Sequence, residues 1–233
     1  MVDKDEILRL LKKNFSYAGP VDISDDGVVS LERSIVNLNY SFRTLEGKVI
    51  SRLPIKFGEV KGNFEVRRSG LRSLEGCPHT VGGNFRCGRN PIKSLKGGPT
   101  KVNRSYHADL CPSLRRLEGA PDEINDEFSV YNSGILNFVG GPQKIGFLDA
   151  AFCNSLSSLD GLAAQVNHIS ISYNRHLPLL RLLNAKKLNF VPHDGVSKEV
   201  YEIIEPYLGQ GEAGAFLCGA QLASAGYKEN ARW

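Results

Sequence analysis

The chain has 233 residues, of which 41% are hydrophobic and 23% are charged, so we expect a folded, soluble protein and exclude a disordered chain. No stretch approaches the roughly 18 to 20 apolar residues of a membrane helix, and the charged start argues against a secretory signal, so we expect a cytoplasmic protein. The net charge is only +4. The cysteine count of five is odd and contains no C-x-x-C pair, which argues against a disulfide framework and a zinc ribbon.

The first predicted element is an N-terminal helix. A capping box from Asp3 to Glu6 precedes an apolar stripe that ends before Gly19-Pro20. Residues 21–42 follow as extended sequence around the turn Asp25-Asp26-Gly27, and we expect strands that begin a sheet. Residues 1–49 are therefore predicted to form an N-terminal cap helix with capping strands.

Residues 50–193 contain a repeat of about 21 residues. The block from Phe64 to Pro78 aligns with the block from Phe85 to Pro99, and the phrase S-L-x-G-x-P recurs in later blocks with variations. These blocks resemble the leucine-rich-repeat consensus L-x-x-L-x-L-x-x-N/C-x-L, in the short form typical of bacterial and bacteriophage proteins. The resemblance covers roughly Ile50 to Val191 and implies an α+β solenoid with one curved parallel sheet.

The consensus assigns a place to each strand residue. The two inward positions of the seven coils are Phe64/Val66, Phe85/Cys87, Tyr106/Ala108, Phe128/Val130, Asp149/Ala151, Ile169/Ile171 and Leu188/Phe190. The Asn/Cys position is Ser69, Asn90, Cys111, Ser133, Asn154, Asn174 and His193. Asp149 stands where an apolar residue belongs, so the register from Ile145 to Ala151 stays open. The return segments are rich in Gly and Pro and are predicted to run as turns.

Residues 194–233 are predicted to form a two-helix C-terminal cap. Ser197 is the expected N-cap of a helix over 198–208, and a second helix is expected over 212–225. Terminal units of this kind cover the last coil of a solenoid. The closing residues 230–233 allow two interpretations, which are Trp233 packed over the last coil and a partner site around Trp233.

The outward positions of the coils are the candidate binding residues. Arg67, Arg68, Arg86 and Arg89 fall on adjacent strands about 5 Å apart, where they could clamp carboxylates or phosphates. The alternative is a solvated basic face with Glu65 as internal partner. Tyr131, Phe152 and Tyr173 are expected to form an exposed aromatic strip, unless a slipped register buries Phe152.

Signals for catalysis and cofactors are weak. His107 and Asp109 share a face at a spacing of two and permit a hydrogen bond, but no nucleophile is fixed beside them, so we interpret them as a polar pair. The five histidines show no metal-ligand spacing, and the Gly-Gly pairs recur with the coil and serve turns. We therefore predict no catalytic residue, no metal and no cofactor.

Charge distribution bears on the partner. Residues 48–120 carry fifteen Lys and Arg against five acids, a local charge of +10, which leaves −6 for the rest of the chain. We expect a non-enzymatic protein-binding module, a phage or bacterial inhibitor or adaptor that binds an acidic surface of a host protein through its concave face. The alternative is nucleic-acid binding by the basic repeats, and an enzyme resting on His107 and Asp109 is the least favoured hypothesis. No membrane partner is expected.

Overall fold

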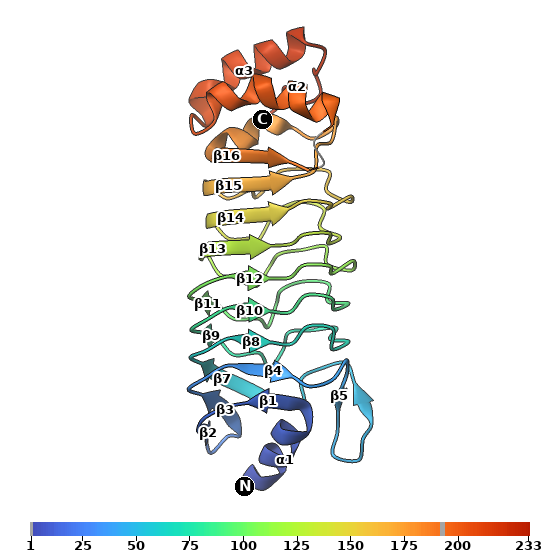
Figure 1. Cartoon of the computed structure of the whole chain (residues 1–233), viewed down its shortest axis with the longest axis vertical. Coiled ribbons are helices and arrows are strands. Elements are labelled where there is room, and N and C mark those ends of the chain that lie inside the picture. The colour runs from blue at the N-terminus through green and yellow to red at the C-terminus, as the bar shows by residue number, and fades with distance from the viewer. Residues whose placement is uncertain (1, 192–193) are drawn as a thin grey trace.

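A computed structural model describes residues 2–191 and 194–233, and His193, which the repeat assigns to the Asn/Cys position, lies outside them. The described chain winds through about six turns of a β-solenoid in which equivalent strands are about 21 residues apart. The coils stack along the long axis of the molecule, with helices at both ends (Figure 1). The sequence repeat is therefore confirmed as a structural repeat.

One face of the solenoid is a sheet of nine strands within the described residues. In spatial order they are β1 (Phe15–Tyr17), β4 (Ile35–Asn37), β8 (Phe64–Glu65), β10 (Phe85–Arg86), β12 (Tyr106–His107), β13 (Glu123–Ser129), β14 (Lys144–Ala150), β15 (Gln165–Ile171) and β16 (Ala185–Phe190). β1 pairs with β4 in antiparallel orientation, and every later neighbour in this order is parallel. We call this surface the sheet face.

A second sheet, which the sequence did not predict, covers the opposite side of the first coils. It contains β2 (Val21–Ile23), β3 (Val28–Leu31), β7 (Lys56–Val60), β9 (Thr80–Val81) and β11 (Lys101–Val102). The return segments of these coils are therefore not turns alone, because Val81 and Val102 pair in parallel register. A separate hairpin joins β5 (Phe42–Arg43) to β6 (Val49–Ile50). In the later coils the end of the return segment and the main strand form one continuous strand, as in β13, β14 and β15.

The interior of the first coils is filled by a ladder of aromatic rings. Phe57, Phe64, Phe85, Tyr106 and Phe128 follow one another with centroid separations of 4.7 to 5.9 Å. Each of these rings is buried. Burial of a side chain of this size stabilises the fold by about 1.5 to 3 kcal/mol, so the ladder is a major part of the core.

The strand register around Asp149 differs from the register predicted by aligning this coil with the repeat consensus. Leu148 lies opposite Phe128 and Ile169, so the inward pair of this coil is Leu148 and Ala150. The assignment of Asp149 and Ala151 to the two inward positions was wrong by one residue. A slip of one residue exchanges the two sides of a strand, and the correct register turns the Asp149 carboxyl outward.

A buried polar ladder follows the strands from β8 to β14, and its members are Ser69, Asn90, Cys111, Ser133 and Cys153. Asn90 is its strongest member, because its Oδ1 accepts from the amides of Ser69 and Leu71 and its Nδ2 donates to Val66 O and Cys87 O. These bonds join two coils and pair backbone groups that have no strand partner. In the later coil this place belongs to Cys153, whose Sγ donates to Val130 O at 3.0 Å.

The assignment of Asn154 to that position was therefore wrong, for the same reason as Asp149. Asn154 is exposed, whereas Cys153 is buried. A second polar ladder precedes the strands and was missed. The backbone N–H of Asn84 donates to Asn63 Oδ1 at 2.8 Å, and the backbone N–H of Ser105 donates to Asn84 Oδ1 at 3.1 Å.

Helices occupy both ends of the solenoid. The helices are α1 (Lys4–Asn14), α2 (Gly195–Ile204) and α3 (Glu212–Ser224), with short 3-10 turns η1 (Leu179–Asn184) and η2 (Glu205–Tyr207). Asp3 caps α1 by accepting from the amides of Asp5 and Glu6. Ser197 was expected to cap α2, but Asp194 does so, and Ser197 is its capping-box partner three residues later.

Candidate binding face

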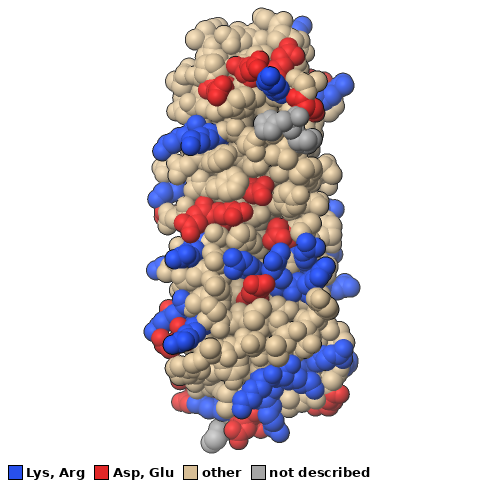
Figure 2. All heavy atoms as spheres, in the orientation of Figure 1, with Lys and Arg blue, Asp and Glu red and all other residues tan. Residues whose placement is uncertain are grey.

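The outward residues of the sheet face form columns that run across the strands. Strand pairing places Val36, Glu65, Arg86, His107, Ser129, Asp149, Ser170 and Asn189 in one such column. Figure 2 shows basic side chains gathered over the lower coils of this face, with acidic side chains above them. The sheet face is therefore divided along its length into a basic and an acidic part.

An exposed apolar group, which the sequence analysis did not select, adjoins the basic part. Val36 belongs to the column described above and lies opposite Ser16 of β1, and Leu38 and Tyr40 follow Val36 along the chain. Tyr40 is 75% exposed, and the guanidinium of Arg68 lies 5.4 Å from the centre of its ring. The alternation of apolar residues from Val36 to Tyr40 is the available signal, but the sequence predicts residues 21–42 only as strands of the N-terminal cap.

The four arginines predicted for the binding face are present there, but they are not equivalent. Arg67 Nη2 donates to Asp109 Oδ2 at 3.3 Å across the coil that contains Gly88. A Cβ at Gly88 would lie 2.5 Å from Asp109 Oδ1, so glycine is needed for this contact. Arg67 is thus paired within the protein.

Arg68 and Arg89 are the exposed pair. Both have positive φ, 56° and 59°, at the turn that follows β8 and β10. A side-chain residue in this conformation costs roughly 1 to 2 kcal/mol, and here it directs the chain sharply off the strand. In the part of the chain that the structure describes, neither residue joins an ion pair.

Acidic side chains gather on the neighbouring strands. Glu127 Oε1 lies 4.0 Å from His107 Nδ1, and Asp149 is two strands away from His107 in the same column. Burial, reinforced by Asp149 and Asp109, raises the pKa of Glu127. Burial is also the main cause of the raised pKa of Asp149. These two residues belong to the candidate site and were missed, since the strand irregularity before Glu127 and the slipped register hid them.

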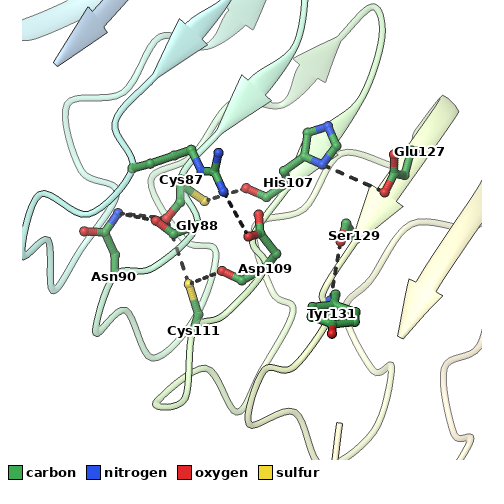
Figure 3. Close-up of polar contacts among 10 residues, drawn as sticks. Cys87, Gly88, Asn90, His107, Asp109, Cys111, Glu127, Ser129 and Tyr131 are labelled. Atoms are coloured by element: carbon green, nitrogen blue, oxygen red, sulfur yellow. Dashed lines mark hydrogen bonds and ion pairs between the residues drawn. The ribbon is translucent and has the colours of Figure 1, made fainter. Parts of the chain in front are cut away.

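His107 and Asp109 do share this face, yet each has another neighbour. Asp109 pairs with Arg67. His107 approaches Glu127 of β13 (Figure 3). Burial lowers the pKa of His107, and the charge of Arg86 lowers it further. Three neighbouring groups on this face, His107, Glu127 and Asp149, thus have shifted pKa values, and a cluster of such groups is typical of functional surfaces.

The predicted aromatic strip is divided. Tyr131 and Phe152 pack edge to face with centroids 5.4 Å apart, and both are half-buried. Tyr173 instead packs against Phe190 and donates its hydroxyl to Asn230 Oδ1 at 3.0 Å. Tyr173 therefore connects the solenoid to the C-terminal segment, and the expectation of one continuous strip was wrong.

The remaining candidate chemistry is limited. In residues 2–191 and 194–233, no group of three His, Cys, Asp or Glu side chains is arranged to hold a metal ion. All five cysteines are buried free thiols, and burial raises the pKa of Cys218 to about 11. Among the same residues, no helix combines the length and apolar character required to cross a membrane. Comparison with protein-family models, with curated proteins and with solved structures finds no match for this chain.

Proposed function

We propose that this chain is a non-catalytic protein-binding module that contacts an acidic surface of a partner through the basic part of its sheet face. The carrying observation is the exposed group of Tyr40, Arg68 and Arg89 beside Arg86. Tyrosine and arginine dominate the energetics of protein interfaces, because each combines apolar area with directed hydrogen bonds. Leu38 and Val36 add apolar area at the same place.

Charge supports the choice of an acidic partner. Arg68 and Arg89 carry charge toward solvent, and Arg86 lies between Glu65 and His107 in the same column. A carboxylate from a partner would gain charge-assisted hydrogen bonds with these guanidinium groups. Glu127 and Asp149 would repel acidic groups placed further along the face, so the charge pattern favours one orientation of the partner.

The wider context of this function is also a proposal. The repeat resembles short leucine-rich repeats of bacteria and bacteriophages, and such solenoids bind partners along their sheets. On this basis we place the chain as a phage or bacterial inhibitor or adaptor acting on a host protein in the cytoplasm. No enzymatic activity is part of the proposal.

Nucleic-acid binding by the sheet face is the alternative. Arg68, Arg86 and Arg89 are available cations there, but Arg67 is already paired and acids follow directly on β12 to β14. Binding to phosphates weakens steeply with ionic strength. An interface anchored by Tyr40 and Leu38 should weaken much less, because apolar burial does not depend on counterion release.

Affinity capture from a bacterial lysate tests the proposal, with nuclease treatment and two variants. We expect one protein to remain bound to the native chain after nuclease, and to be lost from the variant Arg68→Glu/Arg89→Glu. The control Lys186→Glu/Lys187→Glu makes the same charge change at exposed positions of β16 and should keep the partner. Loss of all bound material with nuclease, or equal capture by both variants, would refute binding through the sheet face.

A further inference from the structure

The fifteen cations of residues 48–120 lie on three different surfaces. Four are on the sheet face, and five lie on or near the second sheet and the β5–β6 hairpin. The other six lie in the loops that follow β6, β8, β10 and β12, a surface that we call the loop edge. They are Arg52, Arg72, Lys93, Lys96, Arg115 and Arg116. The largest share of the basic charge is therefore outside the sheet face.

A groove runs between two coils of the loop edge. Its volume is about 720 Å³, and its polar lining consists mainly of Lys93, Lys96, Arg115, Arg116 and the hydroxyls of Ser94 and Ser113. Glu118 is the one acid among its lining residues, and its Oε1 lies 4.0 Å from Arg116 Nη1. The groove thus combines a strong positive charge with neutral hydrogen-bond donors.

Close stacking of the coils sets the spacing of these cations. Gly119 has a φ of 96°, and a Cβ there would lie 2.6 Å from Lys96 Cα. The amide of Arg115 also donates to Lys93 O at 3.1 Å. Neighbouring coils are therefore as close as their backbones allow, with cations repeated at a spacing near that of strands, about 4.8 Å.

One arginine of the groove is held in place by the backbone. Arg115 Nη1 donates to Pro112 O and to Gly134 O, each at 2.7 Å. A Cβ at Gly134 would overlap this nitrogen, so the glycine makes room for the guanidinium. Lys93, Lys96 and Arg116 are exposed. The groove therefore has one fixed cation and three that can adjust to a ligand.

We infer that the loop-edge groove binds the phosphate backbone of single-stranded nucleic acid. Charge-assisted bonds from lysine, arginine and serine suit phosphate oxygens, and the regular row of cations suits a ligand that repeats its charge at every unit. Leu136, 42% exposed in the same groove, offers an apolar surface to a base. Arg72 and Arg52 continue the row on the preceding coils. This site is separate from the sheet face and does not rest on the function proposed for it.

Fluorescence anisotropy with a labelled single-stranded deoxythymidine 12-mer tests the inference, measured from 50 to 200 mM NaCl. The loop-edge variant Lys93→Glu/Lys96→Glu/Arg116→Glu leaves the structurally bound Arg115 in place. The matched control Arg68→Glu/Arg86→Glu/Arg89→Glu makes the same charge change on the sheet face. Thermal denaturation of both variants verifies that they remain folded.

We expect the native chain to bind the 12-mer with an affinity that falls as salt rises. The loop-edge variant should lose at least tenfold in affinity at 50 mM NaCl, and its log–log salt slope should be smaller by about 2, since each phosphate contact on a single strand contributes about 0.7. The sheet-face control should lose less than the loop-edge variant. The inference is overturned if the native chain does not bind, if both variants lose affinity equally, or if poly-glutamate competes as well as unlabelled 12-mer.

Discussion

The two halves of the solenoid keep the same coil spacing with different interiors. From β8 to β12 the main strands are two residues long, a second sheet lies behind them, and Phe64, Phe85 and Tyr106 fill the core. From β13 to β15 the strands are seven residues long, and the inward residues of β14 and β15 are aliphatic. Parallel strand pairing uses backbone groups only, so coils with different side chains stack at one spacing.

The largest difference between the halves should appear in the core. Phe85→Ala removes a buried ring that contacts Phe64 on one side and Tyr106 on the other. We expect a loss of about 4 kcal/mol in the free energy of unfolding, as for other large-to-small changes of aromatic residues. Ile169→Val in the aliphatic half should cost about 1 kcal/mol. Urea denaturation measures both, and a loss below 1 kcal/mol for Phe85→Ala would show that the ladder does not support the fold.

The polar ladder should show the next largest difference. Asn90→Ala leaves several buried backbone groups of two coils without partners, and each costs about 1 to 3 kcal/mol, so we expect a loss of about 3 kcal/mol or more. Cys153→Ala in the second half removes only weak thiol contacts with Val130 O and Ser133 Oγ and should cost about 1 kcal/mol. Equal losses, measured by urea denaturation, would contradict the different roles assigned to the two residues.

The smallest expected effect concerns pH at the junction of the two halves. Because the folded protein raises the pKa of Glu127 above its ordinary value of 4.5, it holds the proton more tightly than the unfolded chain does. This contribution to stability is present at low pH and is lost as pH rises through the folded pKa. His107 acts in the opposite direction, since its lowered pKa makes stability fall as pH drops below its ordinary value of 6.5.

Thermal denaturation between pH 4 and 7 measures this contribution. Glu127→Gln should flatten the decrease in stability above pH 4.5, by a few tenths of a kcal/mol because the group is partly exposed. Asp126→Asn makes the same kind of change at the exposed neighbouring position and serves as the matched control. A steeper decrease in Glu127→Gln would mean that the carboxylate stabilises the folded state.

The local sequence pattern was sufficient to predict a residue's orientation where that orientation depends only on its own coil. The inward positions Phe64, Phe85 and Tyr106 follow from the alternation of strand residues. The placement of Arg67 and Arg86 on the sheet face follows from the same alternation, whereas Arg68 and Arg89 lie at the turns where φ is positive. The prediction for the coil of β14 was wrong because Phe128 is followed by its inward counterpart, Leu148, one residue earlier than the alignment assumed. Alternation from that wrong start then assigned Asp149 to the inward side of the strand.

By itself, the sequence determined the repeat, its period and most inward residues, because these are set by interactions within about twenty residues. Only the tertiary structure decided which side chains meet across coils. The pairing of Arg67 with Asp109, the approach of His107 to Glu127, the addition of Tyr40 to the sheet face and the division of fifteen cations among three surfaces all depend on it. The physical reason is that hydrogen bonds between coils set the register, and a shift of one residue moves every outward side chain to a different neighbour.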